Sequence, residues 1–108
     1  MSDDTVLLCL GTCPDAETAA RLAETLVCEG LAACVNRLPD VRSTYRWQGE
    51  VHTDAEELLL IKTTAARFEA MQARWLALHP YALPELIALP VARGHAAYLD
   101  WVRESVAP

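Results

Sequence analysis

Residues 41–63, VRSTYRWQGEVHTDAEELLLIKT, predict a long β-hairpin that organises the rest of the chain. Gln48-Gly49 has the composition of a tight two-residue turn. The returning arm ends in a buried apolar run, 58–61. Because a typical strand has about five or six residues, these arms are longer than a small sheet needs. Long strand edges invite pairing with another chain, so we expect an oligomer.

The chain before the hairpin predicts a strand followed by a helix. Residues 5–10 form an unbroken apolar run of strand length. Thr12 or Cys13 then caps a helix that has Pro14 near its first position and ends at Gly30. A second strand, 32–36, is interrupted by Pro39-Asp40 and resumes at residue 41, which predicts one long strand with a bulge.

The chain after the hairpin predicts a helix, a strand and a last helix. Thr64 caps the first of these helices, and the strand covers residues 86–91. Apolar residues at spacings of three and four give the first helix a buried stripe: Phe68, Met71, Trp75 and Leu78. The last helix opens at Gly94-His95, and we expect three of its residues to face inward: Tyr98, Trp101 and Val102.

This order, β-α-β-β-α-β plus a helix, predicts an α+β fold of the ferredoxin-like type. One antiparallel sheet would carry two helices on one face, and a third helix would follow at the C-terminus. At 108 residues, we expect a single domain over 1–108. Apolar residues make up 53% of the chain, a surplus that often indicates a buried subunit interface.

The charge and the apolar runs of the sequence limit the kinds of partner that the protein can bind. The net charge of −6 and the pI near 4.9 argue against nucleic acid and against anionic membranes. No apolar run approaches the ~20 residues of a membrane span. The run 6–10 is too short for the core of a signal peptide. We therefore expect a cytoplasmic protein.

The four cysteines form no Cys-x-x-Cys pair, so neither a zinc ribbon nor a redox dithiol is indicated. Cys9, Cys28 and Cys34 lie in apolar surroundings, which predicts small buried hydrophobes. Cys13 lies between a strand and a helix, where a helix N-terminus lowers the pKa of a thiol and improves it as a ligand. A loop cysteine without a role is the alternative.

The segment 79–85, HPYALPE, predicts a stiff loop that carries potential ligands. Its two prolines exclude a helix and restrict the backbone. His79 is a candidate metal ligand, and the alternative is a cap at the C-terminus of the preceding helix. Glu85 is a second candidate, and the alternative is a solvated or ion-paired carboxylate.

Two further groups of side chains are candidates for chemistry. The first alternates along the returning hairpin arm and therefore points to one side: Glu50, His52, Asp54 and Glu56. Neighbours in this row can share an ion, or the row is a solvated edge. The second group is Lys62 with Tyr81 and Glu85, which predicts a Lys62–Glu85 ion pair or an anion site.

No motif in the chain indicates catalysis. It contains no phosphate loop, Rossmann glycine pattern, Gly-x-Ser-x-Gly or His-Glu-x-x-His sequence. No nucleophilic triad assembles, and we predict that the protein is not an enzyme and requires no cofactor.

Several motifs occur together in the order of a known family. They are Leu31-Ala32-Ala33-Cys34-Val35-Asn36, Tyr45-Arg46-Trp47-Gln48-Gly49-Glu50, Leu60-Ile61-Lys62-Thr63, the 79–85 loop, Leu89-Pro90-Val91 and Tyr98-Leu99-Asp100-Trp101. With these, the chain resembles the CutA family, the divalent-cation tolerance proteins. The resemblance implies a homotrimer with an architecture like that of the PII signalling proteins, and a link to copper and other divalent ions.

The resemblance also implies positions for metal ligands and for a cleft. In bacterial relatives the proposed copper ligands are a cysteine and two consecutive histidines, which correspond here to Gly11, Leu78 and His79. Only His79 matches, and our hypothesis is that Cys13 replaces the missing cysteine in binding Cu²⁺. Clefts between subunits would be lined by four residues: Trp47, Lys62, Tyr81 and Glu85.

These observations favour a trimeric protein of divalent-cation tolerance that binds a metal or a small ligand between its subunits. Two alternatives are an enzyme that acts on a small metabolite in the same cleft and a scaffold for a partner protein. The enzyme would need Glu85 or His79 as its general base.

Overall fold

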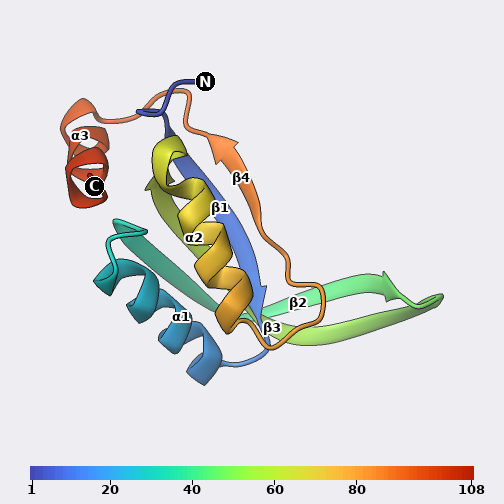
Figure 1. Ribbon diagram of the computed structural model, residues 1–108. Coiled ribbons are helices and arrows are strands. Elements are labelled where there is room, and N and C mark those ends of the chain that lie inside the picture. Colours follow the sequence, from blue (N-terminus) through green and yellow to red (C-terminus); the bar gives the residue numbers. More distant parts are fainter.

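The computed structural model describes residues 1–108 and contains one sheet with three helices (Figure 1). The elements are β1 (Val6–Cys13), α1 (Ala16–Cys28), β2 (Cys34–Trp47), β3 (Glu50–Thr64), α2 (Ala65–Leu78), β4 (Ile87–Pro90) and α3 (Ala96–Ser105). The strand order is β2-β3-β1-β4, and each neighbouring pair is antiparallel. The predicted α+β fold of the ferredoxin-like type is confirmed.

Helix α1 begins later than predicted. Its N-cap is Asp15, whose side chain accepts a hydrogen bond of 2.8 Å from the Thr18 N–H, so the assignment of the cap to Thr12 or Cys13 was wrong. Those two residues still belong to β1, where Cys13 lies opposite Glu57. The pairing with β3 therefore holds the chain extended for longer than its apolar run indicated.

The two faces of the sheet differ in burial. Leu7, Cys9 and Ile61 point toward α1 and α2 and are at most 3% exposed. The core on this side includes Met71 and Trp75 of the predicted α2 stripe, while Phe68 and Leu78 are partly buried. Figure 1 shows α1 and α2 side by side over this one face. The opposite face is covered by no helix along most of its length.

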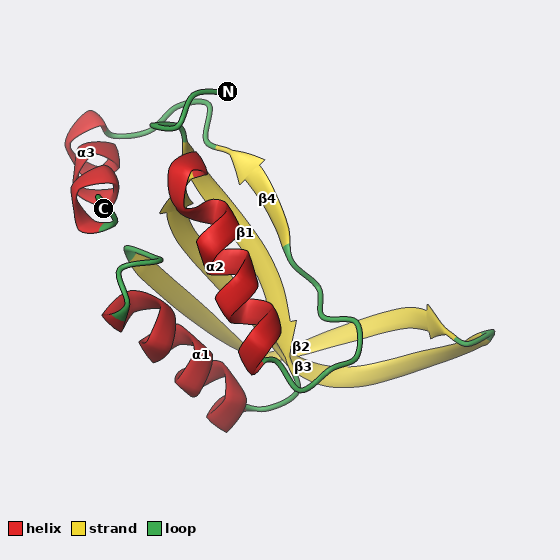
Figure 2. Ribbon diagram, in the orientation of Figure 1, coloured by secondary structure: helices red, strands yellow, loops and turns green.

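The β2–β3 hairpin extends well beyond the sheet (Figure 2). β1 pairs only with Glu57–Thr64 of β3, so residues 50–56 have β2 as their sole neighbour. The predicted bulge lies between Leu38 and Val41, and Asp40 has a φ of 62° there. The predicted turn is also confirmed, with positive φ at both Gln48 and Gly49.

Two predictions of burial were wrong. In α3 only Val102 of the three predicted inward residues is buried, whereas Tyr98 and Trp101 are more than 40% exposed. This helix packs against β3 and β1 without covering the sheet face, so much of its apolar stripe stays open. Among the cysteines, Cys28 is exposed and Cys34 is half-buried, while Cys9 is buried as predicted. No helix is both long enough and apolar enough to cross a membrane.

Candidate functional site

A cavity of about 940 Å³ lies where the β2–β3 hairpin leaves the sheet. Its walls come from the hairpin, from the end of β1 and from the loop between α2 and β4, which crosses the hairpin base (Figure 2). Three of the four predicted cleft residues line it: Trp47, Tyr81 and Glu85. The volume lies within the range of about 300–1,000 Å³ that is usual for small-ligand pockets.

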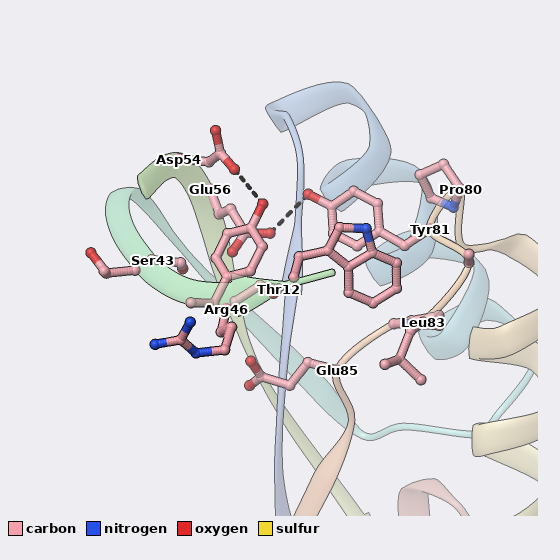
Figure 3. Close-up of a pocket in the computed structure, with 14 residues that line it drawn as sticks. Thr12, Ser43, Arg46, Asp54, Glu56, Pro80, Tyr81, Leu83 and Glu85 are labelled. Atoms are coloured by element: carbon pink, nitrogen blue, oxygen red, sulfur yellow. Dashed lines mark hydrogen bonds between the residues drawn. The ribbon is translucent and has the colours of Figure 1, made fainter. Parts of the chain in front are cut away.

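Two tyrosine–carboxylate pairs build the polar walls of this cavity (Figure 3). The Tyr81 hydroxyl donates to Glu56 Oε2 at 2.8 Å, and the Tyr45 hydroxyl donates to Asp54. Glu56 is only 9% exposed. Burial, with the hydrogen bond to Glu56, raises the pKa of Tyr81. Both phenols therefore keep their protons and hold the carboxylates in fixed positions.

Glu85 adds a third carboxylate from the loop. Desolvation raises the pKa of the Glu85 carboxyl, and the nearby charge of Glu56 raises it further. Arg46 is the one cation in the lining. Three carboxylates against one guanidinium give the lining a formal charge of −2, which favours cationic ligands over anionic ones.

The row of hairpin residues divides into two parts. Asp54 and Glu56 line the cavity, whereas Glu50 and His52 lie nearer the tip, with 3.9 Å between His52 Nε2 and Glu50 Oε2. His52 also stacks on Tyr45, with ring centroids 5.7 Å apart. No three His, Cys, Asp or Glu side chains in the chain converge closely enough to hold a metal ion.

Lys62 lies outside the cavity, and the predicted Lys62–Glu85 ion pair was wrong. Its Nζ donates to the side chain of Asn36 and lies 3.9 Å from Cys34 Sγ, across the β2–β3 pairing. Glu85 lines the same cavity as Glu56. Lys62 is six residues further along β3 than Glu56, a separation of about 20 Å in an extended strand. The lysine therefore finds its partners on the neighbouring strand.

His79 is held by its own loop and by β1. Nδ1 accepts a hydrogen bond from the Tyr81 backbone N–H at 3.1 Å, so Nε2 carries the proton and donates to the Thr12 carbonyl at 2.8 Å. The ring is buried and also packs against Trp75. His79 is the C-cap residue of α2, as the alternative proposed, but its side chain ties the loop to β1. Neither ring nitrogen has a free lone pair.

The prediction of an activated thiol at Cys13 was wrong. Cys13 is fully buried, and burial raises the pKa of its thiol to about 12, with further contributions from Glu57 and Asp15. An activated thiol would need a helix N-terminus at Cys13, but α1 is capped two residues later at Asp15. A thiol with this pKa is a poor ligand near neutral pH.

The residues around His79 do not fit a copper ion. A Cβ added at Gly11, which corresponds to the cysteine of bacterial relatives, would lie 2.5 Å from Trp75 Cζ2. Leu78 offers no donor atom, the His79 nitrogens are occupied, and the Cys13 thiol is buried. Trp75 thus fills the space that the family's cysteine would need.

Tyr45 and Thr12 also line the cavity, although no sequence motif indicated this, and Asp54 and Glu56 were predicted only as members of a charged row. One signal was available. Ser43 lies opposite Asp54 and Tyr45 opposite His52 in the hairpin, and directly opposed residues share a face. The aromatic residues of β2 and the acidic residues of β3 were therefore predictable neighbours.

Comparisons with known proteins place the chain in one family. The model of the "CutA1 divalent ion tolerance protein" family matches residues 7–105. The "Divalent-cation tolerance protein CutA" of Thermus thermophilus is 54% identical over 94 residues, covering 87% of this chain and 91% of the relative. The rice "Protein CutA 1, chloroplastic" is 47% identical over 87% of this chain, which spans 53% of that relative.

Solved structures agree with this result. The divalent cation tolerance protein Cut A1 from Thermus thermophilus superposes with a TM-score of 0.92 at 51% identity, covering 94% of this chain and 99% of that one. CutA from Xylella fastidiosa gives a TM-score of 0.92 at 48% identity, covering 97% and 99%. The resemblance drawn from the motifs is confirmed, and the chain belongs to the CutA1 family of divalent ion tolerance proteins.

Proposed function

We propose that this protein serves divalent-cation tolerance as a cytoplasmic homotrimer of PII-like architecture. Each subunit binds a cationic ligand in the cavity beside the 79–85 loop. The observation that carries this proposal is the cavity itself, which is lined by Asp54, Glu56 and Glu85 and has a formal charge of −2. Binding of this cationic ligand is the protein's role in tolerance, and the protein catalyses no reaction.

The open face of the sheet supports the assembly. Leu10 pairs with Ile87 on one side and with Leu60 on the other, so the three side chains share this face. Ile87 is 53% exposed and Leu89 is 46% exposed. A contiguous apolar surface of this kind marks a subunit interface in a soluble protein. The free edges of β2 and β4 offer backbone groups for pairing between subunits.

Copper binding through Cys13 and His79 is not part of the proposal, because the Cys13 thiol is buried and both ring nitrogens of His79 are hydrogen-bonded. Cations act instead through the acidic cavity, where the carboxylates of Asp54 and Glu85 are exposed.

Growth under metal stress tests this function. Cells that lack their own family member would be challenged with copper and other divalent salts and complemented with the parent chain or with Glu85→Gln. We expect the parent to restore tolerance and Glu85→Gln to restore it only partly. Equal rescue by both would show that tolerance does not depend on the cavity. No rescue by the parent would contradict the proposed role.

A further inference from the structure

We propose that the cavity binds a protonated alkylamine in preference to a bare metal ion. This inference rests on the proposed function and names the class of its cationic ligand. Tyr45, Trp47 and Tyr81 all line the cavity, and each keeps 38–42% of its surface exposed. An ammonium group is attracted to the face of an aromatic ring, most strongly to tryptophan. Three rings among three carboxylates form such a surface.

The two tyrosine–carboxylate pairs and Glu85 present hydrogen-bond acceptors to the cavity. The hydroxyl groups of Tyr45 and Tyr81 already donate their hydrogen bonds to Asp54 and Glu56, respectively. The free lone pairs of these four groups can therefore only accept hydrogen bonds. Glu85 has no hydrogen-bond partner in the protein and adds two more acceptor oxygens. An alkylammonium group carries up to three N–H donors and one positive charge, which matches this wall.

A bare metal ion matches the site less well. A metal needs several donor atoms at about 2.0–2.6 Å from one point, and no three acidic, histidine or cysteine side chains converge in this way. The cavity of about 940 Å³ is also far larger than an ion. Anionic ligands are disfavoured, because the one cation, Arg46, directs Nη1 toward the Gly49 carbonyl at 3.4 Å.

Calorimetric titration of the intact protein tests the inference with three probes at matched ionic strength. Spermidine supplies charge and N–H donors, fully N-methylated spermidine supplies the same charge without N–H donors, and Mg²⁺ supplies charge as a bare ion. We expect spermidine to bind at least tenfold more tightly than either of the other probes. Equal binding of all three, binding of Mg²⁺ alone, or no binding of spermidine would overturn the inference.

Variants assign the binding to the cavity. Glu85→Gln and Trp47→Leu should each weaken spermidine at least tenfold, the first by removing charge and the second by removing a ring at constant charge. Glu24→Gln is the matched control, because Glu24 lies on α1 away from the cavity. Circular dichroism checks that each variant is folded. Equal weakening by Glu24→Gln would mean non-specific attraction and would contradict the proposal.

The two levels of the proposal fail in different ways. A trimeric parent that restores metal tolerance but ignores spermidine would overturn the amine ligand alone. A parent that binds spermidine in the cavity but restores no tolerance would overturn the proposed function alone.

Discussion

At the scale of single residues, Gly11 and Trp75 decide what the centre of this protein can hold. Trp75 is fully buried, and its ring lies where a side chain at position 11 would project. The indole Nε1 is buried without a hydrogen-bond partner, so packing rather than hydrogen bonding fixes the ring. A side chain at position 11 would therefore have to displace Trp75.

Gly11→Ala tests that contact. The new Cβ would meet Trp75 Cζ2 at 2.5 Å and the Glu85 carbonyl at 3.0 Å, so we expect a loss of about 1–3 kcal/mol in the free energy of unfolding. Trp75→Phe should relieve most of this cost, because it shortens the ring. Urea unfolding of the two single variants and the double variant measures the coupling. Purely additive costs would show that the two positions do not compete for space.

Cys13→Ala tests the poor fit to copper. Because the thiol is fully buried and its pKa is raised to about 12, we expect Cu²⁺ to bind the variant as it binds the parent. Competitive titration against a chelator of known affinity gives both dissociation constants. Losing a true ligand or its support costs about tenfold or more in affinity, and a drop of that size would restore Cys13 as a copper ligand.

At the scale of elements, the sequence predicted the hairpin, the bulge and the order of strands and helices because their signals are local. A Gln-Gly turn, a Pro-Asp interruption and helical spacing each act within a few residues. The start of α1 was missed because pairing with β3 keeps Thr12 and Cys13 extended, and that pairing is not local. The partners of Lys62 were missed for a similar reason, because the pairing of β2 with β3 places Lys62 beside Cys34 and Asn36, far from Glu85.

The hairpin turn supplies a prediction at this scale. Both of its central residues have positive φ, at 51° for Gln48 and 83° for Gly49. Asparagine tolerates this region better than glutamine, so Gln48→Asn should raise the free energy of unfolding by roughly 0.5 kcal/mol. Thermal unfolding at fixed chain concentration measures the change.

Gln72→Asn is the control for this change, because Gln72 lies within α2. There asparagine is the poorer residue, and the same substitution should lower stability. A loss of stability from Gln48→Asn as well would contradict the assignment of the turn.

At the scale of the whole molecule, one chain exposes more surface than its mass requires. Its accessible surface is 6507 Å², whereas a compact monomer of 11.9 kDa has about 5,900 Å². Its radius of gyration is 14.3 Å against about 13 Å for a compact domain of this length. The projecting hairpin and the bare sheet face account for this excess. Sequence periodicity placed Tyr98 and Trp101 on an apolar stripe but did not show that their own chain leaves them open.

The bare face also supplies a matched pair of variants. Ile87→Lys places a charge on that face and should weaken the assembly. Leu76→Lys makes the same change at a residue that is 50% exposed on α2, and it should leave the assembly intact.

Sedimentation equilibrium of the parent chain tests the central claim, the homotrimer, most directly. We predict one species of about 36 kDa, three times the 11.9 kDa of a single chain, and its dissociation in Ile87→Lys. A parent that sediments as a monomer of 11.9 kDa at micromolar concentration would contradict the account.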